Sequence, residues 1–231
     1  MGSILMHPYS IVGARWRKVG YLMFTAVLLS SFLQETLIEL FAILPFFTTS
    51  LVPPGLPTFA IFTAIFFVWD RYLWHFPLVS NFTSPPDLRG TWKGGLTSSH
   101  EQTRLGEFEM DTDEVEQQTS EETPIMVIDQ TWSNIKVTID FPHSESISTT
   151  ASVIRDRTDP VLRINYRNHP RGDSPDGVGI HEGTNDLRYR THESGDILEG
   201  KYYTDENRNN HGHVEFQRVD YDRIRDELTF F

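Results

Sequence analysis

The longest apolar segment of the chain, Val19–Trp69, most constrains its fold. Only Glu35 and Glu39 in this segment carry side chains that are ionised at neutral pH. A helix needs about 20 mostly apolar residues to cross about 30 Å of hydrocarbon. Residues 19–44 and 56–76 both reach that length, and a stretch rich in Pro and Gly separates them, where one continuous helix cannot form. The segment therefore predicts a helical hairpin in a membrane.

Basic residues at the edges of this hairpin indicate its orientation. Arg15, Arg17 and Lys18 precede the first span, Arg71 follows the second, and the intervening loop has no Lys or Arg. The positive-inside rule then places both termini in the cytoplasm. A secretory signal peptide over residues 19–33 is the alternative interpretation. No cleavage site of small residues follows it, and a second apolar span comes soon after, which favours the hairpin.

The charge of the chain divides it at about residue 80. The net charge is −12, yet the first 80 residues contain four basic and three acidic side chains, so the acidic excess belongs to the second part. An acidic domain of this size is not expected to bind a DNA or RNA polymer. The absence of cysteine excludes disulfides and thiol catalysis. The expected organisation is a cytoplasmic N-terminus, the hairpin, a linker, a second domain and a C-terminal tail, at residues 1–18, 19–76, 77–86, 87–220 and 221–231.

The second part of the chain has the alternating pattern of β-strands. Short segments rich in Ile, Val, Thr and Tyr are separated by turn sequences such as D-G-V-G and E-S-G-D. We expect an all-β, antiparallel small barrel of about eight strands, with a sandwich as the other architecture for such a pattern. The candidate strands are Leu88–Thr97, Gly106–Asp111, Ile125–Trp132, Ile135–Phe141, Ser146–Arg155, Pro160–Asn168, Asp186–His192, Ile197–Thr204 and His213–Val219.

Alternation also predicts which side chains face the barrel interior. Tyr166 shares a face with the apolar residues of its strand, and the adjacent Tyr202 and Tyr203 must point to opposite sides. Trp92 on the first strand and Arg218 on the last resemble the lipocalin pattern, in which such a pair stacks to close one barrel end. Glycines at three inward positions (90, 94 and 200) either leave room for a ligand or only bend their strands.

Three short motifs and their order resemble a known family. They are D-L-R-G-T-W at 87–92, L-E-G-K-Y-Y-T at 198–204 and G-H-V-E-F-Q-R at 212–218. With the helical hairpin before them, they resemble the two-transmembrane, β-strand-rich, CD-NTase-associated effectors of bacterial anti-phage (CBASS) systems. The resemblance implies a barrel that binds a cyclic dinucleotide, oligomerisation of the chain, and disruption of the inner membrane that kills the infected cell. It also implies multi-pass localisation in the bacterial inner membrane with the barrel cytoplasmic.

A cyclic dinucleotide site needs aromatic rings for the bases, cations for the phosphates and amides or hydroxyls for the base edges. Residues of these types lie near the C-terminal ends of two predicted strands, and core packing alone also explains a buried Tyr. Lys93 and Trp132 are weaker candidates. The predicted ligand-binding residues are Tyr166, Asn168, Tyr202, Tyr203, Thr204 and Arg208.

Glu35 and Glu39 are four residues apart and so share one helical face. They either line the inside of an oligomer or lie at the outer interface of the membrane, because acidic groups are costly in contact with lipid. No catalytic motif or recognised metal-ligand spacing is present, so we expect no enzyme, no metal and no cofactor besides the activating ligand. The alternatives are a membrane-tethered, lipocalin-like carrier of an apolar ligand and an anchor whose barrel docks a partner.

Overall fold

The computed structural model describes residues 6–12, 16–42, 56–76, 85–98, 104–105, 123–155, 159–172, 179–193, 195–206 and 210–219. The chain forms two compact units. One unit combines Met1–Gly13 with Asp87–Phe231, and the other is Ala14–Pro86. The predicted strand Gly106–Asp111 and the tail 221–231 lie outside the described residues.

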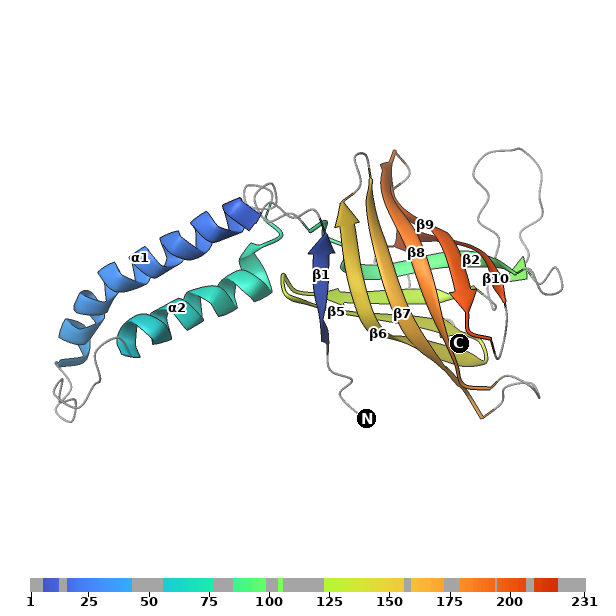
Figure 1. Cartoon of the computed structure of the whole chain (residues 1–231), viewed down its shortest axis with the longest axis horizontal. Coiled ribbons are helices and arrows are strands. Elements are labelled where there is room, and N and C mark those ends of the chain that lie inside the picture. Colours follow the sequence, from blue (N-terminus) through green and yellow to red (C-terminus); the bar gives the residue numbers. More distant parts are fainter. Residues whose placement is uncertain are drawn as a thin grey trace, which may run out of the picture. The chain divides into compact units, whose positions relative to one another are not determined.

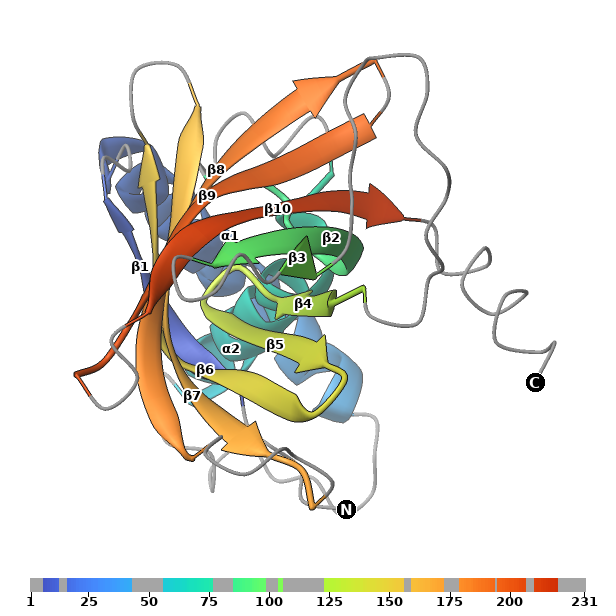
Figure 2. The ribbon, with the colours of Figure 1, turned by 90° about the vertical axis from the view of Figure 1, so that its right-hand side faces the viewer.

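The first unit is a closed β-barrel (Figures 1 and 2). Eight antiparallel strands pair around a ring, which closes where β10 pairs with β2. The short β3 pairs with the end of β2. Strand β1 lies between β5 and β6 and is the ninth strand of the barrel wall. The predicted antiparallel barrel is therefore confirmed. The strands are β1 His7–Val12, β2 Gly90–Ser98, β3 Arg104–Leu105, β4 Ile125–Gln130, β5 Asn134–Phe141, β6 Ser144–Arg155, β7 Pro160–Pro170, β8 His181–His192, β9 Gly195–Thr204 and β10 His211–Val219.

The core of the barrel follows from the period of two in these strands. In β7, buried and exposed residues alternate without interruption from Leu162 to His169. In β9, Tyr202 is 4% exposed, whereas its neighbour Tyr203 is 48% exposed. Burial of one apolar face per strand drives closure, since each fully buried large side chain contributes about 1.5–3 kcal/mol. The core cluster comprises Leu88, Trp92, Met126, Ile128, Ile135, Val137, Ile139, Val153, Leu162, Ile164, Leu187, Leu198, Tyr202, Val214 and Phe216.

Two inward glycines allow atoms of the barrel itself to approach closely. A Cβ added at Gly94 would lie 2.6 Å from Cδ1 of Phe216, and one added at Gly200 would collide with the carbonyl of Asp186. These glycines therefore do not leave open room for a ligand. They instead permit close contact between neighbouring strands, and the interpretation that they bend their strands stays a prediction.

Strand β8 begins at His181, five residues before the predicted start at Asp186. The segment H-E-G-T-N before Asp186 contains no apolar side chain that would mark an inward face in the sequence. In the structure, Gly183 pairs with Tyr166 of β7, and a Cβ at position 183 would collide with the Tyr166 ring. The buried Tyr166 ring lies against Gly183, where only glycine leaves room for it. The strand therefore continues through this position.

Strand β1 was not predicted, because residues 1–18 were expected only to form an N-terminus before the hairpin. It pairs parallel with β6, from Tyr9 opposite Ala151 to Val12 opposite Ile154. It pairs antiparallel with β5, with His7 opposite Ile135. An isolated strand of six residues has little signal in the sequence, since its pairing partners lie more than 120 residues away along the chain.

The second unit contains two helices that pack side by side as a hairpin (Figure 1). Helix α1 spans Trp16–Ala42, α2 spans Leu56–Val68, and a π-helical turn, η2, continues it over Trp69–Leu73. Thr58 of α2 donates a hydrogen bond to Oε1 of Gln34 in α1. An apolar groove of about 280 Å³ between the helices is lined by residues that include Met23, Phe62 and Phe66.

Large apolar side chains of both helices are exposed. Phe24 and Phe32 of α1 are 62% and 77% exposed, and Phe59 of α2 is 67% exposed. Glu35 and Glu39 are also exposed in the single chain. Over the residues that the structure describes, neither helix combines the length and the apolar character needed to cross a membrane.

Candidate functional site

The two ends of the barrel interior differ in chemistry. We call one the closed end, where Trp92 meets Arg218, and the other the polar end, where Asn168, Asn185 and Tyr202 face inward. Strand β10 runs from the polar end at His211 to the closed end at Val219, and β9 runs the opposite way. Each strand of the ring thus contributes to both ends.

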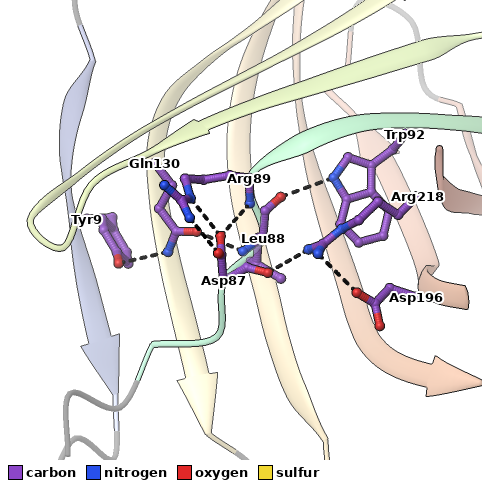
Figure 3. A network of polar contacts seen from close by, with 8 residues as sticks. All are labelled: Tyr9, Asp87, Leu88, Arg89, Trp92, Gln130, Asp196 and Arg218. Carbon is purple, nitrogen blue, oxygen red and sulfur yellow. Dashed lines mark hydrogen bonds and ion pairs between the residues drawn. The ribbon is translucent and has the colours of Figure 1, made fainter. Parts of the chain in front are cut away.

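Arg218 organises the closed end (Figure 3). Its Cζ lies 4.7 Å from the centroid of the Trp92 ring, the contact that the lipocalin pattern implies. Its Nη1 lies 3.0 Å from Oδ2 of Asp196, and its Nη2 donates to the carbonyl of Asp87 at 2.5 Å. The Trp92 Nε1 donates to the carbonyl of Leu88 at 3.1 Å. These contacts join β2, β9, β10 and the segment before β2 at one point.

Asp87 is held as a carboxylate at this end. Burial by itself raises the pKa of Asp87, but hydrogen bonds and charge attraction from Arg89 outweigh it, so the pKa lies below its ordinary value. Arg89 binds the carboxylate through Nε at 2.8 Å and Nη2 at 2.7 Å. Next to this pair, Gln130 accepts from the Leu88 amide at 2.9 Å and donates to the Tyr9 hydroxyl at 3.0 Å. Figure 3 shows this network linking β1, β4 and the start of β2.

Polar side chains are buried at the polar end. Asn168 and Asn185 are each 3% exposed, and Tyr202 is 4% exposed. The Asn168 amide donates to Oγ of Ser146 at 2.9 Å and to Oγ of Ser144 at 3.0 Å. Among the described residues, Oδ1 of Asn168, Oδ1 of Asn185 and the Tyr202 hydroxyl have no hydrogen-bond partner. The register places Asn185 directly opposite Tyr202, whereas Asn168 on the neighbouring strand lies opposite His181, four residues from Asn185 along β8.

Three unpartnered polar atoms at one end of a barrel indicate a binding function. Each such buried group costs about 1–3 kcal/mol relative to a bonded one. A ligand with hydrogen-bond donors and flat apolar faces would satisfy the amide oxygens and contact the tyrosine rings. The arrangement therefore fits a ligand with heterocyclic rings better than a purely aliphatic one.

The predicted ligand-binding residues do not all lie at this site. Tyr166, Asn168 and Tyr202 share the inward face of the polar end. Tyr203 lies on the outer face of β9 and does not join them. The Thr204 hydroxyl donates to the carbonyl of Asn210 at 3.0 Å and accepts from its amide at 2.8 Å, so it already serves the turn between β9 and β10.

Arg208 and Lys93 are the two remaining cations among the candidates from the sequence. Arg208 lies outside the described residues. Lys93 lies on β2, where it pairs with Gln217 on one side and with Ile125 on the other, away from the polar end.

The sequence analysis missed Asn185 and His181. Both are buried on the inward face of β8, and Nδ1 of His181 lies 3.1 Å from the carbonyl of Gly179. Extending the alternation of Leu187 back through Gly183 would have placed both residues inside. Ser146 of β6, which is 2% exposed, was missed because its strand pattern is mostly polar on both faces.

Comparison with known proteins gives two findings. Residues 83–218 match the family described as "Cap15, cyclic dinucleotide receptor domain". A relative named "CD-NTase-associated protein 15" from Yersinia aleksiciae is 26% identical over 231 residues, covering 93% of this chain and 98% of the relative. The matched range contains β2 and every strand after it, except the last residue of β10.

Proposed function

Since the chain belongs to the Cap15 family of cyclic dinucleotide receptors, we propose that its polar end is the receptor site of a ligand-gated membrane effector. The family assigns it to the CBASS effectors with a β-barrel sensor. In our proposal a cyclic dinucleotide binds at the polar end and the chain self-associates. The clustered helices then disrupt the bacterial inner membrane.

The observation that supports this site is the set of unpartnered oxygens on Asn168, Asn185 and Tyr202. Exocyclic amino groups of nucleobases donate hydrogen bonds that these oxygens can accept. Tyr166 and Tyr202 supply rings for base stacking, which is worth about 1–3 kcal/mol per base. Among the described inward side chains of the polar end no Arg or Lys is present. In our proposal, Arg208, the cation among the predicted ligand-binding residues, contacts the phosphates.

The exposed apolar side chains of the helix hairpin support a lipid-facing role. Contiguous apolar exposure on a protein marks an interaction surface, and Phe24, Phe32 and Phe59 are more than half exposed. In the proposed assembly, Glu35 and Glu39 face the inside of a helix bundle rather than lipid. The barrel and both termini then lie on the cytoplasmic side.

Thermal unfolding of the full-length protein in detergent tests the receptor site. A ligand that binds only the folded state raises the unfolding temperature by mass action. We expect a rise with one member of a panel of cyclic di- and trinucleotides, and none with its linear form. A fatty acid tests the alternative of an apolar carrier, for which a rise with the fatty acid alone would be evidence.

Two matched variants locate the ligand. Tyr202→Phe removes an inward hydroxyl, and we expect a loss of affinity of about three- to tenfold, the value of one hydrogen bond. Tyr203→Phe removes a hydroxyl from the outer face of the same strand, and we expect unchanged affinity. The assignment of the polar end as the binding site would be wrong if no cyclic nucleotide raised the unfolding temperature. It would also be wrong if only the Tyr203 variant lost affinity.

Dye release from lipid vesicles tests the role of the helices. The double variant Glu35→Leu, Glu39→Leu should bind the ligand with unchanged affinity and release no dye. Replacement of Thr36, the exposed residue that follows Glu35, by Leu is the control and should leave dye release unchanged. Full dye release by the double-glutamate variant would contradict the proposed role of the two side chains.

A further inference from the structure

Strand β1 occupies a gap in the barrel wall. Strands β5 and β6 pair directly only near their hairpin, from Phe141 opposite Ser144 to Thr138 opposite Ile147. Beyond that point, the pairing of β6 is irregular between Ser148 and Thr150. There β1 enters and pairs with both neighbours. Without β1, parts of β5 and β6 would have unpaired strand edges.

The side chains of His7 and Tyr9 hold β1 in this gap, and the Tyr9 side chain packs against the core cluster. The His7 Nε2 lies 2.8 Å from Oγ of Ser148, and the Tyr9 hydroxyl accepts from Gln130 at 3.0 Å. No residue of β1 is fully buried, in contrast to β7, where every second residue from Leu162 to Asn168 is buried. Pro8 has no amide proton to donate to a neighbouring strand. A strand without fully buried residues opens at lower free energy than the strands of the core.

The connection between β1 and helix α1 is short. The strand ends at Val12 and the helix begins at Trp16. Even a fully extended chain would span only about 14 Å between these two residues. Val12 therefore never lies farther than about 14 Å from Trp16, and a displacement of β1 that would exceed this separation must move the start of α1. The second connection, residues 77–86, is longer and does not impose this constraint as tightly.

Strand β6 links this gap to the polar end. Ser146 of β6 accepts the hydrogen bond of Asn168. Two residues further on, the Ser148 hydroxyl contacts His7 of β1 and accepts from the Val137 amide of β5. Consecutive inward positions of one strand thus contact the candidate ligand site and the N-terminal strand.

We propose that β1 is the element that couples ligand binding in the barrel to the helices, and that the ligand releases β1 from between β5 and β6. This inference rests on the proposed receptor site. A ligand that draws Asn168 toward itself shifts β6 through Ser146 and separates Ser148 from His7. Release of β1 frees the start of α1 and exposes the edges of β5 and β6. Exposed strand edges pair with other chains, so the partner that the open gap fits is a second copy of this chain.

A reversible cross-link in the full-length protein tests the release. The chain has no cysteine, so Ser10→Cys with Ser152→Cys introduces a single pair. The two positions are direct partners across β1 and β6, and neighbouring strands lie about 4.8 Å apart, within the Cα distance of disulfides. The control, Ser152→Cys with Arg163→Cys, joins β6 to β7 instead and leaves β1 unlinked.

In detergent, we expect the oxidised β1–β6 pair to bind the cyclic dinucleotide but to remain monomeric in sedimentation velocity. Reduction should restore ligand-driven self-association, and the β6–β7 control should self-associate in both redox states. Full self-association of the locked protein would overturn the inference while leaving the receptor site intact. A missing rise in unfolding temperature with ligand, in locked and unlocked protein alike, would instead refute the receptor site.

Hydrogen exchange of the unmodified chain gives a second measurement that does not need the cysteines. We expect ligand to accelerate amide exchange in residues 9–12 by about tenfold or more, within the usual range of coupling energies. Amides in the middle of β7 should exchange no faster, because ligand stabilises the folded barrel. Slower exchange in residues 9–12 on ligand addition would show that β1 is held rather than released, and would overturn the proposal.

Discussion

The closed end and the polar end belong to the same eight strands but use buried polar groups differently. At the closed end, Arg218 contacts Trp92, Asp196 and the carbonyl of Asp87, with only its Nε lacking a partner among the described residues. At the polar end, Asn168, Asn185 and Tyr202 each keep an unpartnered oxygen.

This difference separates stability from binding within one small barrel. Paired polar groups add stability and fix strand positions, whereas unpaired ones lower stability unless a ligand completes them. Changes at the closed end should therefore alter stability and spare affinity. Changes at the polar end should do the reverse.

The largest expected effect is that of Trp92→Ala at the closed end. Removal of a fully buried Trp costs about 3–5 kcal/mol of unfolding free energy, and Trp92 is 0% exposed. The unfolding temperature should fall by roughly 10 °C, as measured by circular dichroism. Affinity for the cyclic dinucleotide, measured well below that transition, should be unchanged. Trp92→Phe, which keeps a ring, should lose less stability; a tenfold loss of affinity in either variant would contradict the separation of the two ends.

Substitution at the polar end should lower affinity without lowering stability, the reverse of the effect expected for Trp92→Ala. Asn185→Leu replaces an unpartnered buried amide by an apolar side chain of similar size, and it should stabilise the unliganded protein by about 1 kcal/mol. Affinity should fall about tenfold, which corresponds to about 1.4 kcal/mol. Calorimetric titration and thermal unfolding check both values.

Asn165→Leu is the matched control, because Asn165 lies on the outer face of β7 and its amide binds the Thr150 hydroxyl at 3.0 Å. It should leave affinity unchanged. Loss of stability in Asn185→Leu together with unchanged affinity would show that Asn185 has a structural role only.

The smallest expected effect is the pH dependence from Asp87. Its pKa is lower in the folded protein than in the unfolded chain. Its contribution to stability is therefore complete above the unfolded value of about 3.9 and is lost as the pH falls through the lower folded value. The carboxylate is 36% exposed, so solvent screening limits the contribution to less than about 1 kcal/mol.

Asp87→Asn should accordingly be slightly less stable than the parent at pH 7 and equally stable near pH 2, measured by urea unfolding at each pH. Glu182→Gln, which removes an exposed ion pair with Arg167, is the control and should have a smaller effect at pH 7. A stability difference between Asp87→Asn and the parent that grew as the pH fell would contradict the assignment.

The alternation of single strands made much of the barrel predictable. It identified the inward Tyr166 and Tyr202 and the strands that contain them, whereas the Trp92–Arg218 pair was predicted from its resemblance to the lipocalin pattern. The alternation did not identify strands in which apolar and polar residues alternate only weakly. The first part of β8, H-E-G-T-N, was missed because it contains no apolar side chain; its place in the sheet depends on contacts between strands, such as that of Gly183 with the Tyr166 ring.

The composition of the polar end could be predicted only in part for the same reason. Asn168 was predicted from its position after an apolar run, but Asn185 precedes its run and lies inside because β8 continues backwards. Tyr203 was included among the ligand-binding residues although its neighbour Tyr202 faces the interior, and the structure places it outside.

The sequence by itself determined the two-part organisation, the all-β nature of the second part and the in-or-out orientation within most strands. These properties are local, since composition and a period of two act over a few residues. Only the tertiary structure decided which polar side chains gather at one end and that residues 7–12 complete the wall. Both depend on pairing between segments far apart in the chain, such as Tyr9 with Ala151, and no local pattern encodes such a pairing.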